Sequence, residues 1–411
     1  MELEHREFLK SEQGRKWLIE KALEVVPKEN NWQNFHTPYD LCEHMIFKTD
    51  VTNKSILVLF NIEFLEILIH KFKVPNKNII FLADCRIESE MATKLYKVNN
   101  LIVNSLENIQ EVLKGMKTFD LCFSNPPYGR NDHLKILNAI FPMFNEIIIV
   151  HPARWLLTIK KNQTPIFKEI KNKLHNVVCS FDIFNPNVLF GIDQVAPCCI
   201  THIDKKYKSS IYVNYFDQIK YIEKDINNIT IFCDKWKTIV NPFKEKIEKY
   251  ILENNGEIYS WNQRITDKTD ITKIDKNKFF CQFTAMQPGT GDKTGKFMHG
   301  EDLYKIINPN QDYITSFEKL KQRTQLIFFF DSKTEVYNFL KYLKTDFVRF
   351  CLSIYKADHS LFDGALSLIP VMDFNQEWND DKLFLYFNIP KETIDYITNS
   401  FPADLYGLRS N

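Results

Sequence analysis

The chain has 411 residues, 44% of them hydrophobic and 14% aromatic, which is enough for two domains with buried cores and excludes an intrinsically disordered protein. Its 53 basic and 52 acidic residues leave a net charge of +1, so a nucleic-acid partner has to be sought in local clusters of charge. The nine scattered cysteines form no Cys-x-x-Cys pair and no apolar run could span a bilayer, so we expect no metal site, disulfide framework, membrane segment or signal peptide, and a cytoplasmic protein.

Two helical patterns open the chain. Residues 2–26 have apolar positions at helical spacing, and Pro27 ends that pattern. Thr37 and Pro38 then precede a second helical pattern over residues 39–46. Threonine is a preferred N-cap residue, and proline is common at the first helical position. We therefore predict that the Thr37 side chain caps this helix and that Pro38 is its first residue.

Short apolar runs alternate with helical patterns through the first half of the chain. Such runs are typical of buried parallel strands, and the alternation is typical of an α/β fold with a doubly wound sheet. Two later runs, at residues 177–184 and 196–203, are expected to close the same sheet. The earlier strands are expected at residues 55–60, 78–84, 101–105, 119–123 and 146–150, with helices at 62–72 and 134–144.

Polar residues follow several of these strands, at the sheet edge where α/β proteins bind ligands. Asp84 ends the second strand, and an acid at that place can accept both hydroxyls of a ribose. Asn104 lies at the end of the third strand, and His151 follows the fifth. The plainer interpretations of Asp84 and His151 are a solvated carboxylate and an ordinary turn histidine.

The most informative stretch is the end of the fourth strand. The apolar run 119–123 leads into Asn125-Pro126-Pro127-Tyr128. Neither proline can donate a hydrogen bond to a neighbouring strand, and each restricts the residue before it, so the strand ends here in a stiff turn. Asn125 and Tyr128 are therefore expected at the ligand-binding edge of the sheet.

Such a turn suits methyl transfer to an amine. The exocyclic amine of a nucleobase is a poor nucleophile because its lone pair is delocalised into the ring. Two acceptors on its N–H bonds, the Asn125 side-chain oxygen and the Pro126 carbonyl, would favour a pyramidal and more reactive nitrogen. Tyr128 offers an aromatic face on which a base could stack. An ordinary proline-rich turn is the alternative.

The four residues from Asn125 to Tyr128 resemble motif IV of the S-adenosylmethionine-dependent amino-methyltransferases, above all the N6-adenine DNA methyltransferases. The Thr37-Pro38 step resembles their motif X, and its place upstream resembles the γ-type order. Residues 342–350, 368–374 and 378–390 resemble the C-terminal signature of restriction–modification and phage-type methylases related to the Eco57I group. No known motif covers residues 215–335.

The resemblance implies S-adenosylmethionine as cofactor and assigns residues to it. Thr37 and Pro38 would contact its methionine end, Glu63 its ammonium group, Asp84 its ribose and Asn104 its adenine ring. The sequence departs from the family at motif I. Where the family has a glycine-rich turn, which lets the backbone approach the cofactor, this chain has Phe60-Asn61-Ile62-Glu63.

The resemblance also implies two domains, a Rossmann-like catalytic domain over residues 1–215 and an α+β target-recognition domain over 216–411. The basic groups expected on DNA phosphates are the lysines of residues 160–173, the glycine-rich loop 289–296 and the surface around Lys344 and Arg349. For the lysines of residues 160–173, a solvated helix face is the default interpretation.

The sequence thus favours a DNA adenine-N6 methyltransferase that flips its target base out of double-stranded DNA. A restriction endonuclease or a second copy of the chain would be its protein partner. Two alternatives stay open. One is an amino-methyltransferase that acts on an RNA base or a protein glutamine. The other is a non-catalytic DNA-binding subunit that has lost its cofactor, which the missing glycines would favour.

Overall fold

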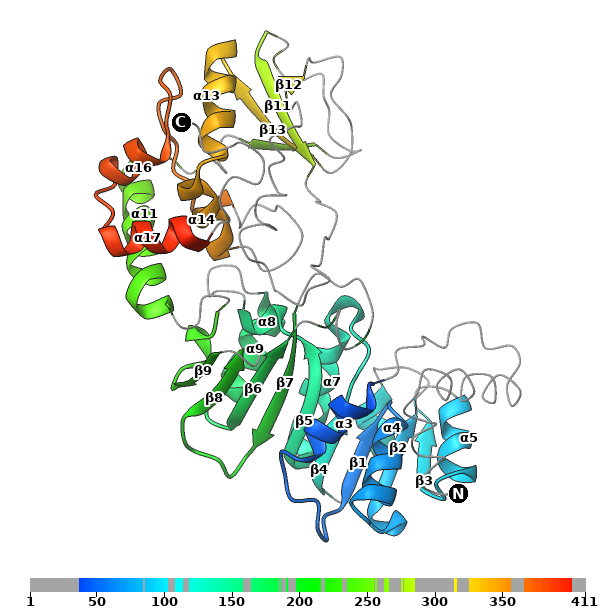
Figure 1. Cartoon of the computed structure of the whole chain (residues 1–411). Coiled ribbons are helices and arrows are strands. Elements are labelled where there is room, and N and C mark those ends of the chain that lie inside the picture. The colour runs from blue at the N-terminus through cyan, green and yellow to red at the C-terminus, as the bar shows by residue number, and fades with distance from the viewer. Residues whose placement is uncertain are drawn as a thin grey trace. The chain divides into compact units, whose positions relative to one another are not determined.

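A computed structural model shows the chain as two compact units, each described here by itself (Figure 1). The first comprises Met1–Ala153, Thr164–Ile192 and Pro197–Ile226, and the second comprises Arg154–Gln163, Asp193–Ala196 and Asn227–Asn411. The residues that the structure describes are 37–83, 86–102, 108–113, 118–157, 164–184, 186, 190, 197–215, 219–230, 235–254, 256, 262–265, 275, 277–284, 314–315, 325–355 and 366–400. The expected helix at residues 2–26 lies outside them.

The first unit is built on a nine-stranded mixed sheet of order β3-β2-β1-β4-β5-β7-β6-β8-β9. The first five strands in sequence are parallel to one another, and β7 is antiparallel to both β5 and β6. The order reverses between β1 and β4, which makes their carboxyl ends the switch point where α/β sheets bind ligands. The strands are β1 (Ile56–Leu59), β2 (Ile79–Ala83), β3 (Asn99–Ile102), β4 (Phe119–Ser124), β5 (Phe144–Pro152), β6 (Val178–Phe184), β7 (Cys198–Asp204), β8 (Ile211–Tyr215) and β9 (Ile219–Glu223).

Helices cover both faces of this sheet, as expected for a doubly wound fold (Figure 1). One face packs against α3 (Tyr39–Ile46) and α4 (Glu63–Glu66), with Phe64 stacked on Phe123 of β4 at 5.6 Å between ring centroids. The other face carries α7 and α9, which contact each other. The helices of this unit also include α5 (Arg86–Lys94), α6 (Ile109–Leu113), α7 (Asp132–Ile140) and α9 (Pro165–Leu174).

Three sequence expectations differ from the structure in detail. The expected helix over residues 62–72 is α4 followed by a π-helical turn, Ile67–Lys71. The expected helix over 134–144 ends at Ile140, because Pro142 interrupts it and Phe144 already pairs with Phe119 as the first residue of β5. The first unit extends past the expected boundary at residue 215, because β9 pairs with β8.

The second unit combines a small antiparallel sheet with helices around an aromatic core. The sheet has the order β10-β13-β11-β12, and Phe328 and Phe330 of β13 pack on Phe339 of α13. Its elements are a π-helical turn (Trp236–Val240), α11 (Asn241–Asn254), β10 (Asn262–Ile265), β11 (Phe279–Thr284), β12 (Ile314–Thr315), β13 (Gln325–Phe330), α13 (Lys333–Leu343), α14 (Asp346–Tyr355), α16 (Asp380–Tyr386) and α17 (Lys391–Ser400).

Helix α14 lies in the centre of this core, and all ten of its residues are buried. Its start is held by Asp380, whose carboxylate accepts hydrogen bonds from the backbone N–H groups of Asp346 and Phe347 at 3.1 and 2.8 Å. Burial raises the pKa of Asp380 to about 6 despite these hydrogen bonds. The C-terminal segments that carry the family resemblance therefore include much of the core of the second unit.

Candidate functional site

Two loops meet at the switch point of the large sheet. One follows β1 and the other follows β4, and their strands are adjacent and parallel, with Leu59 beside Ser124. Phe60, at the start of the first loop, has φ 68°, a left-handed conformation that glycine adopts without strain and a phenylalanine rarely does. The glycine-free loop therefore makes the turn that a glycine usually makes, at a cost of roughly 1–2 kcal/mol.

Asn125 is the centre of the site. It is 8% exposed, and its backbone N–H donates to the Asn61 side-chain oxygen at 3.0 Å. Its side-chain nitrogen donates to the Thr37 hydroxyl at 2.9 Å, and its side-chain oxygen accepts from the Tyr128 hydroxyl at 2.5 Å. Two segments that lie far before it in the sequence, at Thr37 and at Asn61, thus converge on Asn125, and the sequence alone did not assign Asn61 to the site.

The expected helix cap at Thr37 is wrong. Helix α3 begins at Tyr39, Pro38 is its N-cap residue with ψ 138°, and no side chain caps it. The reason is that Thr37 is buried and its hydroxyl is bonded to Asn125. Thr37 was expected to contact the cofactor and Asn125 the substrate. The structure joins their side chains by a hydrogen bond.

Tyr128 is half-buried and packs against the hydrophobic core to which α3 and α4 contribute. Burial, together with the neighbouring thiols of Cys198 and Cys199, raises the pKa of Tyr128 well above its usual value. The phenol therefore stays protonated at any physiological pH and can donate to Asn125. Its ring meets that of His133 edge to face, with centroids 6.1 Å apart.

Two buried histidines lie behind this tyrosine. His133 is on α7 and His151 is near the end of β5, and their ring centroids are 5.4 Å apart. Burial lowers the pKa of His133 to about 4 and that of His151 well below its usual value, where proximity to His133 adds to the effect. His151 also shares a hydrogen bond with the Thr201 hydroxyl at 2.8 Å. Both rings are neutral at pH 7, so neither histidine adds a positive charge to this side of the site.

His133 was not singled out in the sequence. Its signal was its place at the second position of the helix after the Asn-Pro-Pro-Tyr turn. The pairing with His151 depends on β5 lying beside β4, which a linear reading of the chain does not give.

The other predicted site residues are less connected. Pro126 is buried and Pro127 half-buried in the turn, and Glu63 is the half-buried first residue of α4. The structure does not bring Glu63 into hydrogen-bonding contact with Asn125 or Tyr128. Asp84 and Asn104, expected at the ribose and adenine of the cofactor, lie outside the described residues, although β2 does end at Ala83. Among the residues described, no group of histidine, cysteine and acidic side chains could hold a metal ion.

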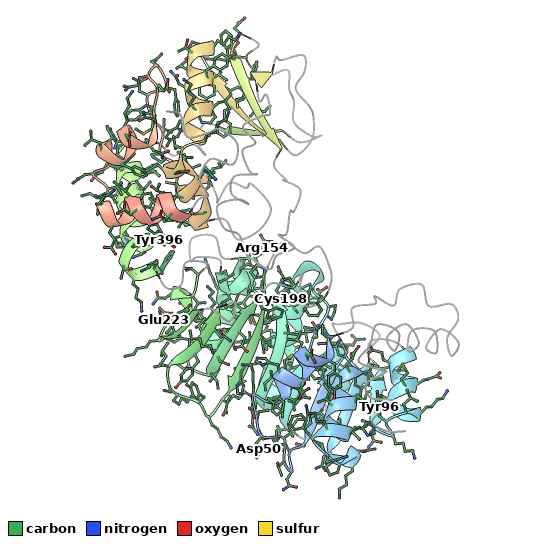
Figure 2. The ribbon with its side chains drawn as sticks, in the orientation of Figure 1. Asp50, Tyr96, Arg154, Cys198, Glu223 and Tyr396 are labelled. Atoms are coloured by element: carbon green, nitrogen blue, oxygen red, sulfur yellow. The ribbon has the colours of Figure 1, made fainter. Side chains whose placement is uncertain are left out.

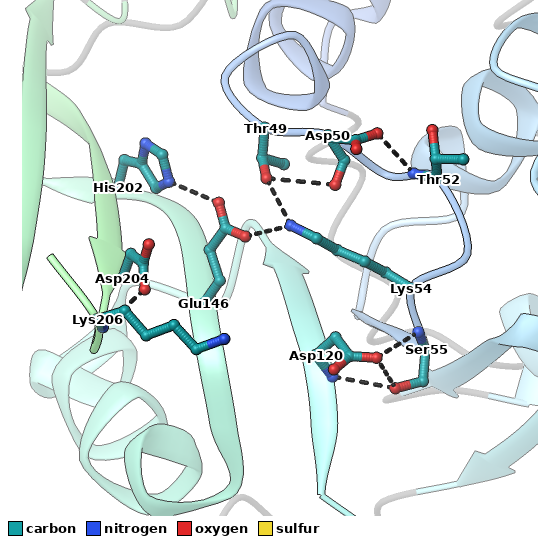
Figure 3. Close-up of polar contacts among 10 residues, drawn as sticks. All are labelled: Thr49, Asp50, Thr52, Lys54, Ser55, Asp120, Glu146, His202, Asp204 and Lys206. Carbon is teal, nitrogen blue, oxygen red and sulfur yellow. Dashed lines mark hydrogen bonds and ion pairs between the residues drawn. The ribbon is translucent and has the colours of Figure 1, made fainter.

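A second polar cluster lies at the other end of these strands, where β1, β4 and β5 begin (Figure 3). Glu146, near the start of β5, binds Lys54 at 2.5 Å and His202 at 2.8 Å. Beside it, Asp120 at the start of β4 accepts from the backbone and hydroxyl of Ser55 at 2.9 and 2.7 Å. Figure 2 shows the two ends of these strands, with Cys198 near one end and Asp50 near the other. The Glu146 cluster ties strands together and is remote from Asn125.

Two of the cationic residues expected on DNA are buried. Lys171 on α9 is 2% exposed, and burial lowers its pKa to about 7. Arg349 on α14 is 6% exposed and pairs with Asp346 at 2.8 Å, so the prediction that it faces DNA phosphates is wrong. Lys168 and Lys173 are exposed on α9. The glycine-rich loop 289–296 lies outside the described residues.

The order of the sheet and the antiparallel β7 define the first unit as a Rossmann-like, doubly wound α/β fold. No protein-family model matches the chain, and no curated protein is detectably similar in sequence. No helix among the described residues is long and apolar enough to cross a membrane.

Solved structures resemble part of the chain. A Vibrio vulnificus YJ016 protein, assigned as the modification subunit of a type I restriction enzyme, is 14% identical over 49% of this chain and 50% of its own, with a TM-score of 0.38. The M protein of the type I restriction enzyme EcoKI is 12% identical over 46% of this chain and 49% of its own, with a TM-score of 0.35. A methyltransferase from Pyrococcus furiosus is 16% identical over 46% of this chain and 98% of its own, with a TM-score of 0.30. The chain thus spans about half the length of the first two.

Proposed function

We propose that this chain is an S-adenosylmethionine-dependent methyltransferase that methylates the N6 amino group of adenine in double-stranded DNA. The observation that carries the proposal is the arrangement of Asn125 at the switch point. Its amide nitrogen is bonded to Thr37, and its oxygen lies on the side of Tyr128. An amide oxygen has two lone pairs, so the Tyr128 hydroxyl leaves one for a substrate N–H.

The cofactor fits the residues present at this edge. The left-handed turn at Phe60 replaces the usual glycine turn, and Glu63 two residues after Asn61 supplies a carboxylate suited to an ammonium group. Pro38, Asp84 and Asn104 are proposed to hold the rest of the cofactor, whereas the Thr37 hydroxyl is bonded to Asn125. When bound, S-adenosylmethionine supplies an electrophilic methyl group on a sulfonium sulfur.

The residues of the chain would then position the amine. Asn125 and the Pro126 carbonyl accept its two N–H bonds, and Tyr128 stacks on the flipped base. Held in this way, the amine would direct its lone pair toward the methyl group that the cofactor would supply, and water would accept the proton that the amine then loses. Positioning of the two reactants supplies most of the rate. The neutral His133 and His151 place no positive charge beside the amine.

Methyl transfer from radiolabelled S-adenosylmethionine to double-stranded DNA, with N6-methyladenine identified by mass spectrometry, tests the proposal. Asn125→Ala should lower the rate by roughly 100-fold or more, as loss of a preorganised hydrogen-bonding group in an active site commonly does. Asn277→Ala, at an exposed asparagine of the second unit, is the matched control and should keep full activity. Wild-type chain that methylates no DNA would contradict the proposal.

The same assay separates the alternatives. Methylation of RNA or of a protein glutamine, with DNA unmodified, would favour an amino-methyltransferase with one of these substrates. The Asn125 oxygen and the Pro126 carbonyl suit their amino groups as well. Calorimetry that detects no S-adenosylmethionine binding, even with DNA present, would favour the non-catalytic subunit. A restriction endonuclease partner remains part of the proposal, and co-purification from a host that carries the neighbouring genes would identify one.

A further inference from the structure

Besides Tyr128, two side chains from earlier in the sequence hold Asn125. Thr37 lies 88 residues before it and Asn61 lies 64 residues before it. Thr37 is 1% exposed and Asn61 is 5% exposed, so both hydrogen bonds are formed away from water. Hydrogen bonds in such surroundings are costly to lose, because a buried donor is then left unsatisfied.

The Thr37 contact concerns the orientation of the amide. A primary amide can turn over and exchange its donor side for its acceptor side with little change in shape. With the nitrogen bonded to Thr37, the oxygen is on the other side, next to the Tyr128 hydroxyl. The backbone around Thr37 is itself fixed, because the carbonyl of Pro38 accepts from the N–H groups of Leu41 and Cys42, each at 3.0 Å.

The Asn61 contact concerns the backbone. The N–H of Asn125 would otherwise be a buried donor at the end of β4, and the Asn61 oxygen satisfies it. Asn61 is itself fixed from the other side, since the preceding Phe60 turns in the left-handed region and its N–H donates to the carbonyl of Leu82 in β2 at 2.9 Å. The loop without glycine therefore links β2 to the turn after β4.

We propose that Thr37 and Asn61 are positioning residues for the proposed methyl transfer. Thr37 holds the nitrogen of the Asn125 amide, which leaves the oxygen toward Tyr128 and the substrate, and Asn61 fixes the start of the turn that carries it. The inference rests on the proposed function and gives Thr37 a role that differs from contact with the cofactor. A positioning residue should affect kcat and leave the affinity for the cofactor unchanged, whereas a residue that contacts the cofactor should affect that affinity.

Thr37→Val and Thr37→Ser form the test pair. Valine keeps the shape of threonine without an acceptor, and serine keeps the hydroxyl. An unsatisfied buried donor corresponds to a loss of about 5- to 100-fold. Thr37→Val should therefore lower kcat by about that factor while the calorimetric Kd for S-adenosylmethionine changes less than about twofold. Thr37→Ser should restore most of kcat. Asn61→Ala should lower kcat in the same manner, with thermal unfolding measured for every variant.

Other outcomes decide against the inference. If Thr37→Val weakens S-adenosylmethionine binding by the same factor as it lowers the rate, Thr37 serves the cofactor instead. If Thr37→Val has wild-type kcat and Kd, neither role holds.

A wild-type chain without activity would defeat the proposed function, yet the inference could still be tested. In protein labelled with 15N-asparagine, the side-chain NH2 signal of Asn125, identified by its loss in Asn125→Ala, should shift in Thr37→Val and stay in place in Thr37→Ser. An unshifted signal in Thr37→Val would overturn the positioning role.

Discussion

At the scale of single residues, the Tyr128 hydroxyl is the group whose removal is most informative. Tyr128→Phe keeps the ring for stacking but removes the donor to Asn125, a hydrogen bond with a net value of about 1 kcal/mol. We expect kcat to fall by roughly 5- to 10-fold in Tyr128→Phe and much further in Tyr128→Ala, which also loses the stacking face. Steady-state kinetics measure both, with Tyr337→Phe at an exposed tyrosine as the control. Equal losses in the two variants would contradict a stacking role.

The buried histidines predict how stability depends on pH. The pKa of His133 is about 4 in the folded chain because of burial, against an ordinary value of 6.5. The folded state therefore binds fewer protons than the unfolded state between these values, and the free energy of unfolding falls as pH decreases from about 6.5 to 4. Protonation of His133 should lower the free energy of unfolding by up to about 3 kcal/mol over this pH range.

Chemical denaturation at pH 7 and at pH 5 measures this loss. His133→Gln, which cannot titrate, should lose less stability between the two pH values than wild type. If His133→Gln has the same pH dependence as wild type, His133 is not the group that titrates.

At the scale of elements, the Glu146 cluster connects the start of β5 with β7 and with the segment before β1. Burial raises the pKa of Glu146, but hydrogen bonds from His202 and Lys54 outweigh it and bring the pKa to about 2. The stabilisation that the ionised Glu146 contributes is thus fully present above about pH 4.5 and is lost as pH falls toward 2.

We expect Glu146→Gln to lower the free energy of unfolding by about 2–4 kcal/mol, because Lys54 then lacks its partner in a part-buried site. The matched control is Glu169→Gln, whose partner Lys173 is exposed on α9, and it should change the free energy of unfolding much less than Glu146→Gln does. Urea unfolding compares the two. Methyl transfer by folded Glu146→Gln should equal wild type, since the cluster lies at the edge opposite Asn125.

At the scale of the whole molecule, a net charge of +1 means that affinity for DNA has to come from local contacts. Lys293 and Lys296 in the glycine-rich loop remain the predicted contacts, and replacing both by alanine should reduce the slope of log affinity against log salt by about two units. Arg349→Ala should instead lower the melting temperature and leave that slope unchanged, because Arg349 is buried against Asp346. Fluorescence anisotropy over a salt series distinguishes them. A wild-type slope in the double variant would place the loop away from DNA.

Asn125 shows what a local pattern could and could not give. The sequence predicted its place at a strand end and its acceptor oxygen, because two prolines stop a strand wherever they occur. The structure adds the buried hydrogen bond from its side chain to Thr37, so we expect Asn125→Ala to lower the free energy of unfolding by about 1–2 kcal/mol.

Periodicity and turn chemistry were enough to determine the α/β class and the positions of seven strands of the large sheet, since a strand's length and polarity are properties of neighbouring residues. The partners of Asn125, the pairing of His133 with His151 and the burial of Arg349 were decided only by tertiary structure. Each depends on which strands and helices lie side by side. That is set by packing between segments 18 to 88 residues apart, or by a core that surrounds a helix on all sides. Phe60 is the clearest case, because a left-handed phenylalanine is adopted only where the surrounding fold imposes it.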